Sequence, residues 1–217
     1  LCEKTGADID ELSKAIGMDH RIGSHFLKAS VGFGGSCFQK DILNLVYLCK
    51  YYGLEEVAEY WHQVVKINNY QKNRFAKKII EEFSGSLKNK NIAILGWAFK
   101  AKTNDSRESA SIHVSKKLIE AGANLNIYDP MVNKERVYSD MSLVIKNKTD
   151  FYRIKYFDSL ENTINNVDGI AFLTQWDEFI NFNWKEFLKK SSLRIKIFDG
   201  RNFLQDHFKN YNQYFRL

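Results

Sequence analysis

Residues 91–109 read NIAILGWAFKAKTNDSRES, and this stretch indicates the fold class. The run 92–95 is short, apolar and rich in isoleucine, which is typical of a strand buried on both faces of a parallel sheet. Gly96 ends the run, and a helical pattern follows from about Arg107 to Glu120. A strand followed by a helix is the repeating unit of α/β folds.

The rest of the C-terminal half repeats this alternation. Further strands are expected at 125–128, 154–157, 169–174 and 195–198, with helical segments between several of them. The pattern predicts an α/β domain with a Rossmann-like, doubly wound parallel sheet over residues 89–217. The stretch 131–153 is polar and aromatic, and its pattern predicts no particular element.

Residues 1–88 have a different pattern and are predicted to be a helical region. Helices are expected at 8–16, 38–52 and 55–83, the last with apolar side chains at helical spacing. A helix of about 29 residues would span roughly 43 Å. Such a helix must pack along its length, and we expect a spacer between domains or a dimer seam.

Composition narrows the class of protein. The chain has 217 residues, of which 44% are hydrophobic and 27% charged, as in ordinary globular proteins. No apolar run has the length of a membrane span, and no signal-peptide pattern opens the chain, so we expect a cytoplasmic protein without a membrane partner. The three cysteines are odd in number and lack metal-ligand spacing, which favours a reducing compartment and predicts no metal site.

The net charge of +6 leaves a nucleic-acid-binding domain as an alternative. However, the sequence has no dense basic motif, and nucleic acid is not expected as a partner. Lysines such as Lys72, Lys77 and Lys78 are scattered along predicted helices. We expect them to lie on solvated helix faces.

Cys37 is the candidate nucleophile. It lies in the glycine-rich stretch GFGGSCFQKD, residues 32–41, which leads into a predicted helix. A thiol at a helix start meets the positive end of the helix dipole, which favours the thiolate. Asp41 follows one helical turn later, on the same face. A small buried cysteine without a chemical role remains the alternative.

A second group of residues lies at the predicted ends of strands, where ligands bind in such sheets. Lys100 and Arg107 follow the first strand, and Arg201 follows the last. The first loop has one glycine where a dinucleotide fingerprint needs three, so it does not predict NAD binding there. Three cations suit a diphosphate. Alternatively, Arg107 pairs with Asp105 or Glu108 and is structural.

Taken together, the motifs resemble the UDP-glucose 6-dehydrogenase family within the nucleotide-sugar dehydrogenases. The resemblance covers the whole chain and is carried by residues 21–23, 26–41, 92–109, 128–130, 175–177 and 198–201. It implies NAD-dependent four-electron oxidation of UDP-glucose to UDP-glucuronate, through a thiohemiacetal and a thioester on Cys37. It also implies a homodimer built on the helical region, or a larger oligomer.

The resemblance further assigns roles to individual residues. Cys37 and Asp41 match the catalytic pair, in which Asp41 handles protons and water. The matches to substrate-binding residues are Arg21, Lys28, Ala29, Ser30, Val31, Gly32, Phe33, Gly34, Phe99, Lys100 and Arg201. Arg107 and the segment from Cys37 to Lys40 match residues near NAD. Arg21 matches an arginine that reaches the substrate of a neighbouring subunit.

The chain departs from the family in one large respect. It contains no G-x-G-x-x-G turn, whereas the family begins with an NAD-binding domain that carries one. We therefore expect the C-terminal part of an enzyme, inactive alone but able to bind a UDP-sugar weakly. The alternatives are a dehydrogenase for UDP-N-acetylmannosamine or GDP-mannose, and a non-catalytic module for UDP-sugar binding or oligomerisation.

Overall fold

A computed structural model describes residues 1–191 and 194–217. Its centre is a six-stranded sheet in which every strand pairs in parallel, in the order β3-β2-β1-β4-β5-β6. The strands are β1 (Asn91–Leu95), β2 (Asn124–Tyr128), β3 (Ile154–Tyr156), β4 (Gly169–Phe172), β5 (Lys196–Asp199) and β6 (Tyr214–Arg216). The chain order reverses between β1 and β4, so the predicted doubly wound Rossmann-like sheet is confirmed.

The central strands are apolar because both of their faces are covered. Every residue from Ile92 to Leu95 is fully buried, and β4 is buried throughout. Phe172 of β4 packs edge-to-face against Trp184 and Phe203, with ring centroids 5.1 and 5.9 Å away. Burial of such large side chains contributes about 1.5–3 kcal/mol each.

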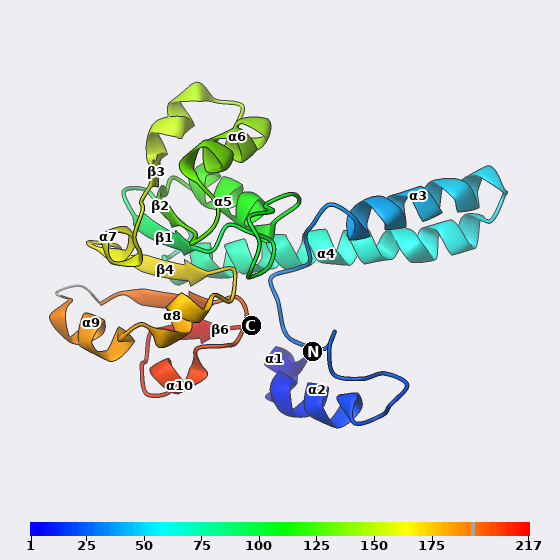
Figure 1. Ribbon diagram of the computed structural model, residues 1–217, viewed down its shortest axis with the longest axis horizontal. Coiled ribbons are helices and arrows are strands. Elements are labelled where there is room, and N and C mark those ends of the chain that lie inside the picture. Colours follow the sequence, from blue (N-terminus) through cyan, green and yellow to red (C-terminus); the bar gives the residue numbers. More distant parts are fainter. Residues whose placement is uncertain (192–193) are drawn as a thin grey trace.

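Helices surround the sheet (Figure 1). They are α5 (Ala110–Glu120), α6 (Lys134–Val144), α7 (Leu160–Ile164), α8 (Asp177–Asn181), α9 (Trp184–Lys190), α10 (Gln205–Phe208) and the 3₁₀ helix η1 (Lys148–Arg153). The stretch 131–153, for which the sequence predicted no element, therefore consists largely of α6 and η1. Strand β6 was not expected, and α5 begins at Ala110 rather than at Arg107.

The N-terminal helices are α1 (Cys2–Thr5), α2 (Ile9–Gly17), α3 (Phe38–Tyr51) and α4 (Glu55–Glu82). Helices α3 and α4 form a hairpin that projects away from the sheet (Figure 1). A small apolar cluster that includes Val46, Cys49 and Ala58 joins them. The other half of α4 contributes Phe75 and Ile79 to the core of the sheet. Helix α4 is long because one half packs against α3 and the other half packs against the sheet.

Lys72, on α4, contradicts the expectation of a solvated lysine. Only 2% of its surface is exposed, because α4 packs there against the glycine-rich loop and α5. Lys77, by contrast, lies with most of its side chain in solvent beside Glu81. Helical periodicity alone did not reveal which face of α4 is covered.

Candidate functional site

Cys37 lies at the N-terminal end of α3, where its backbone occupies the capping position. The residue is exposed, and its thiol makes no capping hydrogen bond to the helix. The hydroxyl oxygen of Ser36 lies 3.6 Å from the sulfur. The fold therefore presents a thiol that a ligand can reach.

Asp41 lies one turn further along α3. Its backbone N–H donates to the carbonyl oxygen of Cys37 at 2.8 Å, which closes the first turn of the helix. Its carboxylate is exposed and lies 4.0 Å from the ammonium nitrogen of Lys40. An exposed ion pair of this kind contributes at most about 1 kcal/mol. The carboxylate therefore remains available to water near Cys37.

The glycines before Cys37 allow two loops to touch. A Cβ atom on Gly34 would lie 2.6 Å from the carbonyl oxygen of Glu108, and one on Gly35 would lie 3.0 Å from the Phe99 ring. Gly35 also donates its N–H to the carbonyl oxygen of Arg107 at 2.8 Å. The Cys37 loop is thus packed directly on the loop between β1 and α5.

Arg201 is anchored where β5 ends. Its guanidinium donates to the carbonyl oxygens of Leu173 at 2.9 Å and Phe99 at 3.1 Å. The backbone N–H of Arg201 donates to the Asp199 carboxylate at 2.9 Å. Burial lowers the pKa of Arg201, and the nearby Asp199 charge opposes that shift. Because arginine titrates so far above neutrality, the side chain remains a cation.

Lys28 and Arg201 line one cavity of about 390 Å³, which we call the Arg201 cavity. Its other lining residues include Asp10, Ser24, Gln175, Asn202 and Phe203. The segment before Cys37 is held here because the fully buried Val31 donates its N–H to the Gly200 carbonyl oxygen at 3.0 Å. Lys14 also lines the cavity, and three cations in a concave site suit a phosphate-bearing ligand.

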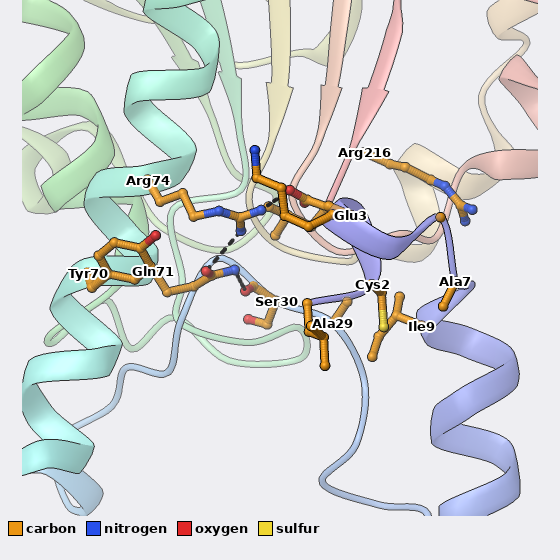
Figure 2. A pocket seen from close by; sticks show the side chains of 14 residues that line it. Cys2, Glu3, Ala7, Ile9, Ala29, Ser30, Tyr70, Gln71, Arg74 and Arg216 are labelled. Atoms are coloured by element: carbon orange, nitrogen blue, oxygen red, sulfur yellow. Dashed lines mark hydrogen bonds and ion pairs between the residues drawn. The ribbon is translucent and has the colours of Figure 1, made fainter.

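Ala29 and Ser30 line a different cavity, of about 640 Å³, between α1, α4 and the C-terminal strand (Figure 2). Gln71 donates to the Ser30 carbonyl oxygen at 3.0 Å, and Arg74 donates to Gln71 at 3.1 Å. Arg74 also pairs with Glu3. The predicted substrate segment from Lys28 to Val31 therefore runs between two cavities, and only Lys28 lines the Arg201 cavity.

Arg107 forms the pair with Asp105 that the sequence left as an alternative. Its guanidinium donates to both carboxylate oxygens, at 3.0 and 2.9 Å. The pKa of Arg107 is raised, chiefly by this hydrogen bonding and to a smaller extent by the charge of a Cys37 thiolate. Lys100 is exposed, with its ammonium 5.4 Å from the centre of the Phe99 ring. Arg107 therefore has a structural partner and also lies within electrostatic reach of Cys37.

Arg21 is the predicted site residue that stands apart. It lies between α2 and α3 with most of its side chain exposed, and its guanidinium donates to both carboxylate oxygens of Asp19. It lines neither of the two cavities described above. A contact with another subunit remains a prediction for this residue.

Sequence patterns missed a group of buried polar residues behind the Cys37 loop. Asn68 exchanges two hydrogen bonds with the backbone of Phe33, and Lys72 donates to the Glu108 carbonyl oxygen at 3.4 Å. Burial lowers the pKa of both Lys72 and His113. In the sequence, the available signal was that Asn68 and Lys72 are four residues apart, one helical turn. Exposed polar pairs on helices have the same spacing, so this signal does not indicate burial.

Residues that could hold a metal ion do not cluster in the part of the chain that the structure describes. Within residues 1–191 and 194–217, none of the helices has both the length and the apolar character of a membrane span.

Comparison with known protein families matches both parts of the chain. Residues 93–206 match the UDP binding domain of the UDP-glucose/GDP-mannose dehydrogenase family, and residues 1–70 match the central domain of the same family. The first of these matches covers more than half of the chain. The chain belongs to the UDP-glucose/GDP-mannose dehydrogenase family.

Several members of this family are close in sequence. The chain is 48% identical to UDP-glucose 6-dehydrogenase of Gallus gallus over 95% of its own length and 42% of that protein. It is 45% identical to UDP-glucose 6-dehydrogenase 2 of Arabidopsis thaliana over 94% of the chain and 45% of the relative. The chain therefore spans less than half the length of these curated relatives.

A solved structure agrees with the fold. The UDP-glucose dehydrogenase of Pyrobaculum islandicum superposes with a TM-score of 0.76 at 28% identity, covering 98% of this chain and 44% of that one. A GDP-mannose dehydrogenase from Pseudomonas aeruginosa gives a TM-score of 0.68 at 22% identity, over 99% of this chain and 47% of that one, which shows the shared fold alone.

The members of the family named above are dehydrogenases, but the sheet described here does not fit the dinucleotide NAD. In a dinucleotide site a helix N-terminus follows the first strand directly through a glycine-rich turn. Here β1 ends at Leu95, whereas α5 begins only at Ala110. A Cβ atom on Gly96 would also lie 2.5 Å from the Cβ of Thr174. The end of β1 therefore lacks the glycine-rich turn into a helix that a dinucleotide requires.

Proposed function

We propose that this chain is the UDP-sugar-binding and thiol-bearing part of a UDP-glucose 6-dehydrogenase. The proposal rests on one observation: the Cys37 loop packs against the loop that contains Phe99. Arg201, which lines the Arg201 cavity, donates a hydrogen bond to the carbonyl oxygen of Phe99. The thiol and the cavity are thereby linked through Phe99. Relatives at 45–48% identity carry the UDP-glucose 6-dehydrogenase name, which supports UDP-glucose over other sugar nucleotides. In the proposed whole enzyme, two molecules of NAD⁺ would be needed, one as the hydride acceptor for each of the two oxidation steps, held mainly outside these 217 residues.

The proposed chemistry at this site begins with the aldehyde at the sugar C6 position. The Cys37 thiolate adds to the carbonyl carbon, and the oxygen takes a proton, which gives a thiohemiacetal. Loss of a hydride from that carbon, for which NAD⁺ would be the acceptor, together with loss of the hydroxyl proton leaves a thioester. Water then adds, the carbon–sulfur bond breaks, and the carboxylate and the thiol are released. A covalent adduct retains the aldehyde and divides the oxidation into easier steps.

Asp41 has the role of orienting or deprotonating the water in this scheme. A general base must lie close to the proton that it removes. Asp41 is exposed, follows Cys37 by one helical turn, and has only a long ion pair with Lys40. Lys28, Lys100 and Arg201 have the role of binding the diphosphate of the substrate. Arg107 has a role near the cofactor, because it lies beside Cys37.

A binding experiment tests the substrate class. Calorimetry on the 217-residue chain should show weak binding of UDP-glucose and weaker binding of UDP-N-acetylmannosamine and GDP-mannose. Mixing the chain with UDP-glucose and NAD⁺ should give no rise in absorbance from NADH, because the chain lacks a dinucleotide turn. Sustained NADH production would contradict the division of labour proposed here. Preference for GDP-mannose would favour a different substrate within the family.

The reactivity of Cys37 separates an enzyme from a non-catalytic UDP-sugar-binding module. Peptide mass spectrometry after brief iodoacetamide treatment at pH 7 should show Cys37 labelled at least about tenfold faster than Cys2. Cys2 is the matched control, because it is also a free and partly accessible thiol. Equal labelling of the two would favour the non-catalytic module.

We also propose that the hairpin of α3 and α4 forms a homodimer interface. Its surface exposes a run of large apolar and aromatic side chains: Leu43, Leu45, Tyr47, Leu48, Tyr51, Tyr52, Leu54, Val57 and Tyr60. So many exposed apolar side chains on one hairpin favour an interaction site there. A larger oligomer and a cytoplasmic location stay predictions.

Charge placed on this patch should separate the subunits. Tyr47 and Tyr51 lie one turn apart on α3 and are 64% and 71% exposed. The double variant Tyr47→Glu, Tyr51→Glu should elute at the mass of one chain in light scattering, and the parent at twice that mass. The control Lys77→Glu, on the exposed face of α4, should remain dimeric. A parent that runs as a monomer at tens of micromolar would contradict the interface.

A further inference from the structure

Asn68 and Lys72 of α4 are polar residues in a place where apolar ones are usual. They lie one turn apart on the same face of the helix, and only 4% and 2% of their surfaces are exposed. A buried amide or ammonium is unfavourable unless hydrogen bonds replace the lost water. The partners of these two side chains therefore indicate why they are buried.

Asn68 binds the peptide backbone of the Cys37 loop on both sides of one residue. Its side-chain oxygen accepts from the Phe33 N–H at 2.8 Å, and its side-chain nitrogen donates to the Phe33 carbonyl oxygen at 3.0 Å. The neighbouring Gly32, at φ +122°, has no room for a side chain, since a Cβ would lie 2.7 Å from the Asn68 oxygen and 3.1 Å from Lys72. The loop therefore rests directly on this pair.

Lys72 binds Glu108, which packs against the Cys37 loop. Its ammonium donates to the carbonyl oxygen of Glu108 at 3.4 Å. Glu108 has a φ of +54°, which is strained for a residue with a side chain. Its carbonyl oxygen packs over Gly34, and its carboxylate accepts a hydrogen bond from Gln39 at 3.1 Å. Glu108 therefore contacts the chain on both sides of Cys37.

The charged groups around Lys72 come from two other elements. Glu108, from the loop before α5, offers a carboxylate, and His113 of α5 lies with its Nε2 3.8 Å from that carboxylate. Burial lowers the pKa of Lys72, and the charge of Glu108 opposes this shift. The Glu108 carbonyl and carboxylate thus offset the burial of the ammonium.

We propose that Asn68 and Lys72 are positioning residues for Cys37, which hold the glycine-rich loop and the strained Glu108 so that the sulfur stays beside Arg107. The proposal rests on the proposed function, because it assigns these residues to the placement of the nucleophile. It makes α4 the element that connects the thiol to the loop of Phe99, Lys100 and Arg107. The two side chains touch no ligand themselves.

The test compares two alkylating reagents on the 217-residue chain without ligands. Anionic iodoacetate is favoured over neutral iodoacetamide where a guanidinium lies beside the sulfur, and the ratio of the two labelling rates cancels changes in accessibility. At Cys37 this ratio should fall about threefold in Lys72→Met and also in Asn68→Leu, which removes no charge. Lys72→Arg keeps the cation and should leave the rate ratio close to that of the parent. The control Lys77→Met removes the same charge from an exposed position and should leave the ratio unchanged.

Amide hydrogen exchange provides a second readout. Exchange at Phe33 and Gly35 should be about tenfold faster in Lys72→Met and Asn68→Leu than in the parent. Faster exchange with an unchanged reagent ratio would mean a structural clamp only and would overturn the proposal, as would no change in either quantity. If Lys72→Met does not fold, Asn68→Leu and Lys72→Arg decide the outcome. None of these measurements depends on UDP-glucose binding or turnover, so the proposed function can fail separately.

Discussion

Replacing Arg201 by Met should weaken UDP-glucose binding to this chain about 10- to 100-fold. A charge-assisted hydrogen bond to a phosphate contributes about 1.5–3 kcal/mol, and each 1.4 kcal/mol is a factor of ten in affinity. The Arg201 guanidinium is already held by the carbonyl oxygens of Leu173 and Phe99, so little side-chain freedom remains to be lost on binding. Isothermal calorimetry measures the change directly.

Two controls separate the charge of Arg201 from its geometry. Arg201→Lys keeps the cation but not the planar fork, and we expect an affinity between those of the parent and the Met variant. Lys209→Met removes a charge from an exposed position and should bind like the parent. If Arg201→Met binds UDP-glucose with unchanged affinity while its melting temperature is also unchanged, the Arg201 cavity is not the substrate site.

The second large effect is expected at Asp129, which ends up buried at the end of β2. One carboxylate oxygen accepts from the N–H groups of Trp97 and Ala98, at 2.6 and 2.9 Å, and from the Trp176 indole at 3.1 Å. The other accepts from the N–H groups of Met131 and Val132, both at 2.9 Å. Asp129→Ala would leave these donors buried without an acceptor.

We expect Asp129→Ala to lower the free energy of unfolding by about 3–5 kcal/mol, the usual effect of breaking a buried charged network. For a chain of this size that lowers the melting temperature by roughly 10 °C. Asp129→Asn keeps one acceptor oxygen, and its free energy of unfolding should lie between those of the parent and Asp129→Ala. The control Asp158→Ala, at an exposed position, should stay within about 0.5 kcal/mol of the parent. Calorimetric or circular-dichroism melts would contradict the expectation if Asp129→Ala and Asp158→Ala melted together.

Asp129 also shows how the two halves of the site depend on one another. By holding the N–H groups of Trp97 and Ala98, it fixes the backbone that leads to Phe99. Phe99 in turn packs on Gly35 of the Cys37 loop and accepts from Arg201. Loss of Asp129 should therefore weaken ligand binding as well as stability.

Much of the fold could be predicted because its central strands, β1 and β4, are buried on both faces. Segments such as 92–95 are continuous apolar runs, and each lies in a strand of the sheet. Strand β6 has only three residues, all partly buried, so its pattern is too short to detect. Helix α6 was missed because its buried face includes Asp140, which accepts from the Trp97 indole and from Ser106.

The candidate site was predictable only in part. The glycine-rich stretch before Cys37 and the basic residues after strands are local signals, and the structure brings these loops into contact. It also separates residues that the resemblance grouped, since Ala29 and Ser30 line a different cavity from Arg201. A segment that passes between two cavities has neighbours on both sides, and its sequence does not say which residue faces which.

The sequence by itself determined the alternating strands and helices, the thiol at a helix start and the family of the chain, because these are properties of adjacent residues and their spacing. Only the tertiary structure decided the partners of the buried polar groups. Lys72 is buried and bonded to a residue 36 positions away, whereas Lys77 on the same helix is solvated. Burial depends on which distant segments cover a face, and helical periodicity alone cannot specify that.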